Sequence, residues 1–365
     1  MNWRALNALG SLGDVFVMPA KAGIQSTSEL DPGFRRGDVF VSLAVGLALL
    51  IWSAMPAQAQ QKWRHGILQS KADAGFIYMA KEKGFFAKRG LDVEYVNLRG
   101  DRDVTRALLA GELQSGEPSP GGPLQAIAGG ADIRFVGSSI PGLPYALYVR
   151  KDIADWADLK GKTFGVSAPG STPDLVARTM LARKGVDPET IRIANAGGSA
   201  GRVQAVAGGK VDATASSSEF VPIVGKLGIK VMGLAADIVP EYPRFTIVVR
   251  AETIKQNREA LINFLAAYME GLDYAVHHRD ETIALAARID DDKDVSDPTF
   301  SHMFDEATEK HYVSTTSEIP RKGIEWLQDE LVKTGELKER IELDRYIDGS
   351  LREEALTRVK LSSDR

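Results

Sequence analysis

The chain has 365 residues, of which 44% are hydrophobic and 26% are charged. This balance supports two domains with cores of their own and excludes a disordered chain. The formal net charge is only −4, so no basic face argues for nucleic acid. Cysteine is absent, which excludes a disulfide framework, a thiol nucleophile and a lipid-modified cysteine.

An apolar run near the N-terminus, residues 39–52, has the layout of a secretory signal. Two arginines precede it and Pro56-Ala57-Gln58-Ala59 follows, with the small residues that suit cleavage. We predict a signal peptide over 39–59, cleaved after Ala59. The run is shorter than the roughly 20 residues of a spanning helix, and an uncleaved anchor is the alternative. Residues 1–38 fit no part of a signal, and we interpret them as an over-extended gene start.

From Trp63 onward the pattern alternates between strands and helices. The expected elements, in chain order, are a strand over 63–69, a helix over 73–83, a strand over 92–97, helices over 103–110 and 123–128, and a strand over 133–137. Such alternation predicts an α/β fold with a mostly parallel sheet covered by helices on both faces.

The same layout recurs after Lys162. Gly90-Leu91-Asp92 and Ala110-Gly111-Glu112-Leu113 correspond to Gly185-Val186-Asp187 and Gly208-Gly209-Lys210-Val211. Self-similarity of this kind predicts two alike α/β lobes.

Two extended apolar runs, 145–150 and 245–250, each end in arginine. We interpret them as paired crossover strands, which makes 150–245 the second lobe and assigns 60–149 and 246–365 to the first. The C-terminal part is predicted to be helices that cover the first lobe, with apolar residues at helical spacing: Leu261, Phe264, Leu265, Tyr268 and Leu272. A cleft between two lobes is a favoured ligand site.

The most informative stretch is Asp158–Asp174. A strand over 162–168 is broken by Pro169-Gly170, and Ser171 and Thr172 are good caps for the helix that follows. The unpaired N–H groups of that first turn would attract carboxylate, sulfonate or phosphate. The alternative is an ordinary turn capped by its own hydroxyl.

Candidate ligand contacts share one position, the loops at the carboxyl ends of predicted strands, where open α/β sheets bind ligands. The candidates are Ser70, Phe76, Glu117, Ser119, Ser138, Ser139, Gly170, Ser171, Thr172, Gly198, Ser199, Ser217 and Glu219. Hydroxyls and glycine N–H groups can wrap an oxyanion, although any one serine could instead face solvent or cap its helix.

Charged residues near these loops allow two interpretations. Glu117 and Glu219 would prefer an amine or hydroxyl donor if they face the cleft, as in a zwitterion or a heterocycle, and otherwise they are surface acids. Arg99 and Arg102 could neutralise an acid, but their polar turn favours solvation. We therefore do not include these two arginines among the candidate contacts.

No pattern calls for a cofactor or a metal. The five histidines lack the tight spacing of a metal site, and His302 with Glu306 fits a helix surface. A Walker loop, a dinucleotide motif and a nucleophile elbow are all absent from the sequence.

Several short motifs, in this order, resemble the periplasmic solute-binding proteins of importers for nitrate, sulfonates, taurine and thiamine-pyrimidine precursors. They are Lys83-Gly84-Phe85-Phe86, Gly90-Leu91-Asp92-Val93-Glu94, Asp158-Leu159-Lys160-Gly161-Lys162, Gly165-Val166-Ser167 and Gly209-Lys210-Val211-Asp212-Ala213. The resemblance covers about 62–356. It implies the type II periplasmic-binding fold, in which two crossover strands join two lobes. The lobes close on a small polar ligand. The family often has aspartate where this chain has Gln114.

The resemblance implies a non-enzymatic, monomeric periplasmic component that delivers a small organic anion or zwitterion to an ABC permease of the inner membrane. A related eukaryotic branch makes the thiamine pyrimidine with an active-site histidine and iron near cysteines, so an enzyme is the first alternative. The predicted export signal argues against this alternative, and so does the absence of cysteine. A ligand-sensing domain is the second alternative.

Overall fold

The computed structural model describes residues 60–68, 71–290 and 294–362. The predicted extension, signal peptide and cleavage point lie outside these residues, and so does Ser70. Within the described ranges, no helix is long and apolar enough to cross a membrane.

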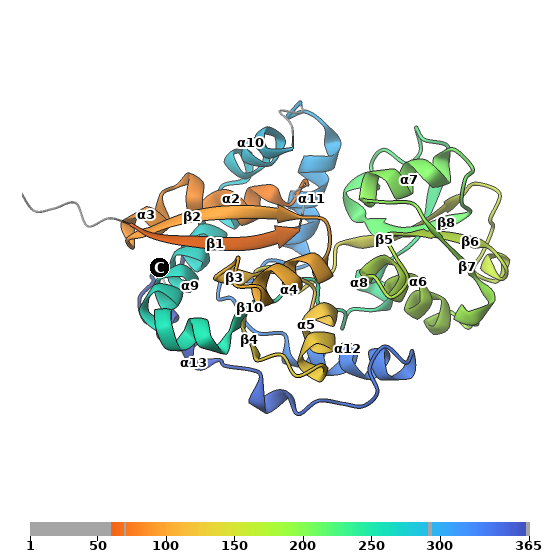
Figure 1. The fold of residues 1–365 in the computed structure, drawn as a ribbon. Helices are drawn as coiled ribbons and strands as arrows, with labels where there is room; N and C mark the ends of the chain where they lie inside the picture. Colours follow the sequence, from red (N-terminus) through yellow and green to blue (C-terminus); the bar gives the residue numbers. More distant parts are fainter. Residues whose placement is uncertain (1–59, 69–70, 291–293, 363–365) are drawn as a thin grey trace, which may run out of the picture. The chain divides into compact units, whose positions relative to one another are not determined.

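The first lobe is built on a five-stranded sheet in the order β2-β1-β3-β10-β4 (Figure 1). Its strands are β1 (Gln61–Leu68), β2 (Leu91–Leu98), β3 (Ser115–Gly116), β4 (Ile133–Gly137) and β10 (Ile247–Arg250). Strand β1 runs parallel to β2 and β3, whereas β10 is antiparallel to both of its neighbours. The sheet is therefore mixed, with one reversed strand.

Helices of the first lobe come from both ends of the described chain. They are α2 (Ala74–Glu82), α3 (Phe85–Lys88), α4 (Asp101–Leu109), α5 (Gly121–Ala128), α9 (Ala251–His277), α10 (Arg279–Ile289), α11 (Pro298–Glu309), α12 (Arg321–Lys333) and α13 (Ser350–Leu356), with the short 3₁₀ turn η4 (Leu343–Arg345). Helix α9 packs against α2, α3 and α13, so the C-terminal part completes the first lobe as predicted.

The second lobe has a sheet in the order β7-β6-β8-β5-β9. Its elements are β5 (Tyr145–Arg150), β6 (Thr163–Val166), β7 (Arg192–Asn195), β8 (Ala213–Ser217), β9 (Ile229–Leu234), helices α6 (Thr172–Arg183), α7 (Ser199–Ala207) and α8 (Ala235–Ile238), and 3₁₀ turns η1 (Ala157–Leu159), η2 (Pro188–Thr190) and η3 (Ser218–Phe220). Here β5 is the reversed strand. The predicted pair of alike lobes is confirmed in this architecture.

The predicted pairing of the two crossover runs is wrong. Strand β5 pairs with β8 and β9 of the second sheet, and β10 pairs with β3 and β4 of the first. The chain passes between the lobes at 138–144, the first crossing, and at 239–246, the second crossing. The two crossings meet there, where Phe245 N donates to Ile140 O at 3.1 Å and Ser138 Oγ donates to Phe245 O at 2.5 Å. The second sheet therefore begins at Tyr145, before the predicted boundary at 150.

The core of the first lobe is centred on α9. Leu261, Phe264, Leu265, Tyr268 and Leu272 are all fully buried, because they recur on the face of α9 that packs against neighbouring elements. The predicted apolar face of this helix is confirmed.

Glycine turns mark equivalent places in the two lobes. Gly90 precedes β2 with φ of +74°, and Gly185 follows α6 with φ of +77°. These values lie in the left-handed region that side chains disfavour. The sequence repeat thus reflects the same chain reversal used twice.

Glu306 of α11 is a buried contact between the lobes, so the predicted helix surface at His302 and Glu306 is wrong. Its carboxylate accepts hydrogen bonds from Ser218 Oγ of the second lobe and from Tyr312 OH. His302 Nε2 lies 3.5 Å from the same carboxylate. Packing of α11 against η3 makes this burial, and helical spacing alone gives no sign of it.

Candidate functional site

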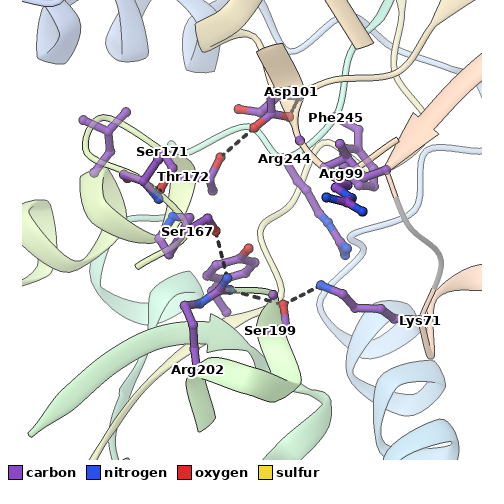
Figure 2. Close-up of a pocket in the computed structure, with 18 of the residues that line it drawn as sticks. Lys71, Arg99, Asp101, Ser167, Ser171, Thr172, Ser199, Arg202, Arg244 and Phe245 are labelled. Carbon is purple, nitrogen blue, oxygen red and sulfur yellow. Dashed lines mark hydrogen bonds between the residues drawn. The ribbon is translucent and has the colours of Figure 1, made fainter. Parts of the chain in front are cut away.

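A cavity of about 660 Å³ lies between the two lobes. Its lining comes from the loops that follow β1, β2, β6 and β8, from the starts of α4, α6 and α7, and from the second crossing (Figure 2). These are mostly carboxyl ends of strands, where α/β sheets place their ligands. The volume falls within the roughly 300–1,000 Å³ of small-molecule sites.

Arg202, in the first turn of α7, is a buried cation in this lining with no carboxylate partner among the described residues. Its Nε donates to Ala215 O, Nη1 donates to Ser167 Oγ and Gly197 O, and Nη2 donates to Ser199 Oγ and Ser216 Oγ. All five N–H groups are therefore matched by neutral acceptors. The hydrogen bonds hold the guanidinium in place, but its charge stays uncompensated.

Ser199 links the Arg202 guanidinium to the cavity. Its hydroxyl accepts a hydrogen bond from Arg202 Nη2 at 3.2 Å and another from Lys71 Nζ of the opposite lobe. A hydroxyl has two lone pairs and one proton, so two accepted bonds leave its O–H free to donate. Two cations thus polarise a single donor at the cavity wall, which suits an anion.

The start of α7 adds backbone donors at the same place. Gly198 is its N-cap and no described side chain caps it, and Gly198, Ser199, Ala200 and Gly201 line the cavity. The first N–H groups of a helix have no partner within it and carry partial positive charge. They strengthen the preference of this wall for an anion.

The start of α6 differs, although the helix begins where the sequence predicts it. Ser171 is the N-cap residue, and its Oγ donates to Ala168 O. Gly170 N donates to the carboxylate of Asp174 at 2.9 Å, and Thr172 Oγ1 donates to Asp101 at 3.3 Å. Carboxylates of the chain itself already lie at this helix end, so α7 is the better anion site.

Asp101, the first residue of α4, lies at a second wall of the cavity. Its carboxylate accepts from Ser119 N at 2.7 Å and from Thr172 Oγ1 of the other lobe, and no ion pair with a described residue compensates it. Burial raises the pKa of this carboxyl, whereas its hydrogen bonds and the charge of Arg244 lower it. Burial raises the pKa of nearby Tyr242, and the charge of the Asp101 carboxylate adds to that rise.

Arg244, on the second crossing, forms a buried ion pair with Asp73, with 2.5 Å between Nη2 and Oδ2. The arginine is only 8% exposed, and its Nη1 has no hydrogen-bond partner among the described residues. Figure 2 shows this guanidinium directed into the cavity, near Arg99 and Lys71. Arg244 Nη1 is therefore an N–H donor that a ligand in the cavity could use.

Glu219 is a buried carboxylate that accepts from Ala72 N of the opposite lobe at 3.2 Å. Burial raises its pKa, Lys71 opposes that rise, and the like charge of Asp73 adds to it. The folded protein therefore disfavours the ionised form of this side chain more than the unfolded chain does.

We expect Glu219→Gln to melt about 2 °C higher than the wild type at pH 7 to 8, since it removes a disfavoured charge but keeps the acceptor. A raised folded pKa costs stability at pH above that pKa, and the cost fades as pH falls to the unfolded value. The gain should therefore shrink toward pH 4, which thermal melts across pH would measure. The exposed Glu353→Gln serves as control; an equal shift in it, or a gain that grows in acid, would contradict this reading.

Seven of the predicted contacts line the cavity together. They are Ser119, Gly170, Ser171, Thr172, Gly198, Ser199 and Glu219. Arg99 and Arg102, which the sequence favoured as solvated residues outside the candidate set, line the cavity as well.

Five others lie elsewhere. Phe76 stacks on Phe304 in the core, with ring centroids 5.4 Å apart. Ser138 ties the two crossings together, and the Ser217 carbonyl accepts from Tyr148 OH at 2.6 Å. The remaining pair is Glu117 with Ser139.

Glu117 is buried within the first lobe and is no surface acid. Its carboxylate accepts from Tyr268 OH at 2.7 Å and from Ser139 N at 3.2 Å, and His65 Nε2 lies 3.6 Å away. The two donors come from α9 and the first crossing, and the nearby imidazole comes from β1. The network fixes the loop that carries Ser119 at the cavity.

Four charged residues of the lining were not predicted from the sequence: Lys71, Asp101, Arg202 and Arg244. One signal was available for Arg202, which follows the predicted contact Ser199 by three residues. Helical side chains lean toward the N-terminus of their helix, so residues at this spacing share a face at the helix start. The chain gives no comparable local sign for Arg244.

Comparison with solved structures identifies the fold. The periplasmic nitrate-binding protein NrtA of Synechocystis PCC 6803 aligns with a TM-score of 0.69 and 17% identity, over 84% of this chain and 90% of that one. The periplasmic aliphatic sulphonate-binding protein SsuA of Escherichia coli aligns with a TM-score of 0.65 and 19% identity, over 80% and 99%. The periplasmic-binding fold expected from the resemblance is confirmed.

Sequence comparison points the same way. The chain is 25% identical over 308 residues to YtlA of Bacillus subtilis, which is named only as a candidate binding protein, and the match spans 76% of this chain and 84% of YtlA. A family model described as NMT1/THI5 like matches residues 71–282, which run from just before α2 to the start of α10 and include the whole second lobe and both crossings. Since that match covers more than half of the 365 residues, the protein belongs to the NMT1/THI5 like family.

Proposed function

We propose that the protein is the substrate-binding component of an ABC importer and that it captures a small organic anion or zwitterion between its lobes. One observation supports a negative charge on the ligand: Arg202 is buried at the cavity wall and, among the described residues, donates only to neutral acceptors. An anion in the cavity would compensate that charge in a site shielded from water. The start of α7 and Lys71 support the same preference.

The relatives support the role. Proteins with this fold are named for binding nitrate and sulphonate, and YtlA is named as a candidate binding protein. We place the protein in the periplasm as a monomer, exported by the predicted signal with cleavage after Ala59, where it would present its ligand to a membrane permease.

The mechanism requires binding and closure and no chemical step. The lobes touch directly across the cavity through Lys71–Ser199, Thr172–Asp101 and Ala72–Glu219. A ligand that contacts both walls would add to these bonds only when the lobes are closed, so it would shift the population toward the closed form. A permease can distinguish the two forms.

The test is a panel of ligands measured by thermal melting and calorimetry: nitrate, alkyl and aryl sulfonates, carboxylates, pyrimidines and simple amines. We expect an organic anion or zwitterion to raise the melting temperature, with about 2.7 kcal/mol of stabilisation at a hundred times its Kd. Mass spectrometry should recover the ligand unchanged. A panel without any shift, with no small molecule co-purifying in native mass spectra, would refute the proposal, as would turnover of a bound compound.

A further inference from the structure

The cavity has one end that favours an anion. We call Arg202, Lys71, Ser199 and Ser167 the cationic end. The two cations make no ion pair within 4.0 Å among the described residues, and both serine hydroxyls accept from Arg202. Each hydroxyl proton is left to donate into the cavity.

A different wall favours a hydrogen-bond donor. We call Asp101, Ser119, Thr172 and Tyr242 the carboxylate end. Figure 2 shows Asp101 and Thr172 well apart from Arg202 and Lys71. Each oxygen of Asp101 accepts one hydrogen bond, from Ser119 N or from Thr172 Oγ1, and each keeps a second lone pair. An N–H group of a ligand would be a natural partner.

Between these ends and other polar residues, part of the lining is apolar and contains several rings. This apolar part includes Leu68, Ile77, Tyr145, Phe220, Ile223 and Phe245. The volume of about 660 Å³ is far more than a four-atom inorganic anion or a two-carbon chain would fill. Apolar walls of this extent reward a ligand with an apolar body of its own.

We propose that the ligand is an amino-substituted cyclic acid: an acidic group at the cationic end, a ring against the apolar walls, and an N–H donor at Asp101. The inference rests on the proposed function and narrows it. A plain anion would leave the remaining lone pairs of Asp101 without a donor from the ligand, and a plain amine would bring no anion to Arg202. Only a ligand with both an acidic group and an N–H donor complements both ends of the cavity.

The probes differ by one feature at a time. We would measure Kd by calorimetry for 4-aminobenzenesulfonate, its 3-amino isomer, benzenesulfonate without the donor, taurine without the ring, and aniline without the acid. At least one aminobenzenesulfonate should bind about tenfold more tightly than benzenesulfonate, the equivalent of one good polar contact. Taurine should bind at least about tenfold more weakly than that isomer, and aniline should not bind measurably.

The variant Asp101→Asn tests the assigned donor contact. Asparagine can still accept from Ser119 N, so the loop keeps its anchor while the charge is lost. The ratio of Kd values for benzenesulfonate and the better amino isomer should fall from about ten toward one. Because a ratio compares two ligands on one protein, partial misfolding would leave it unchanged. The exposed Asp92→Asn of β2 is the matched control and should keep the wild-type ratio.

The outcomes separate the two proposals. Equal binding of benzenesulfonate and both amino isomers would overturn this inference and leave anion capture standing. Tighter binding of taurine or nitrate than of any ring compound would also overturn it, as would an amino preference that survives Asp101→Asn. If no acid binds at all, both the inference and the proposed function fail.

Discussion

Arg202→Met is expected to lower affinity for the captured anion by at least about 100-fold, or roughly 2.7 kcal/mol. The substitution removes the uncompensated buried charge and the donor that polarises Ser199 and Ser167. Ser199 would then accept from Lys71 alone, so its hydroxyl would be a less polarised and less firmly oriented donor. The anion would lose both the charge of Arg202 and part of its hydrogen bond from Ser199. Calorimetry with the strongest ligand of the panel measures the effect.

Two further variants separate binding from folding in this test. Arg202→Lys keeps the charge with fewer donors and should recover part of the affinity. Arg192→Met removes an exposed arginine of β7 in the same lobe and should bind as the wild type does. Wild-type affinity in a folded Arg202→Met protein, as judged by circular dichroism, would show that the anion lies elsewhere.

Phe264→Ala is expected to destabilise the protein by about 3–5 kcal/mol. The ring is fully buried on α9 and stacks on Trp63 and Phe86, with centroids 5.6 and 5.3 Å away. Its removal opens a cavity where α9 meets β1 and α3, and few neighbours can move in. Denaturant unfolding would measure a change comparable to a large part of a typical total stability of about 5–15 kcal/mol.

Phe85→Ala provides the matched comparison, since that ring on α3 is only partly buried and should cost clearly less. Phe264→Leu, which keeps most of the volume, should also cost less than the alanine variant. If the two alanine variants were equally destabilised, the aromatic cluster under α9 would not be the core of the first lobe.

The fold was predictable because its signals are local. Strand β4 has the bounds that the sequence predicts, and α6 begins at the predicted cap Ser171. Gly90 and Gly185 predict chain reversals because a left-handed backbone conformation favours glycine wherever it occurs. Partners of strands are less local, and the pairing of β5 with β10 was wrong because each crossover run joins the sheet of a different lobe.

The candidate site was predictable in position and less so in chemistry. Ser119, Thr172 and Ser199 line the cavity because they follow strands, which is a rule of topology. Glu117 obeys the same rule, yet Tyr268 from α9, about 150 residues away in the chain, draws its carboxylate inward.

By itself, the sequence determined two α/β lobes, their order along the chain and the loops that face one another, since hydrophobic periodicity and turn residues act over short distances. Only the tertiary structure decided which charges remain uncompensated in the cavity. Arg202 has only neutral acceptors among the described residues, because folding brings Ser167, Ala215 and Ser216 to it from other segments. The electrostatic character of a buried group depends on every neighbour that folding brings to it, and those neighbours are far apart in the chain.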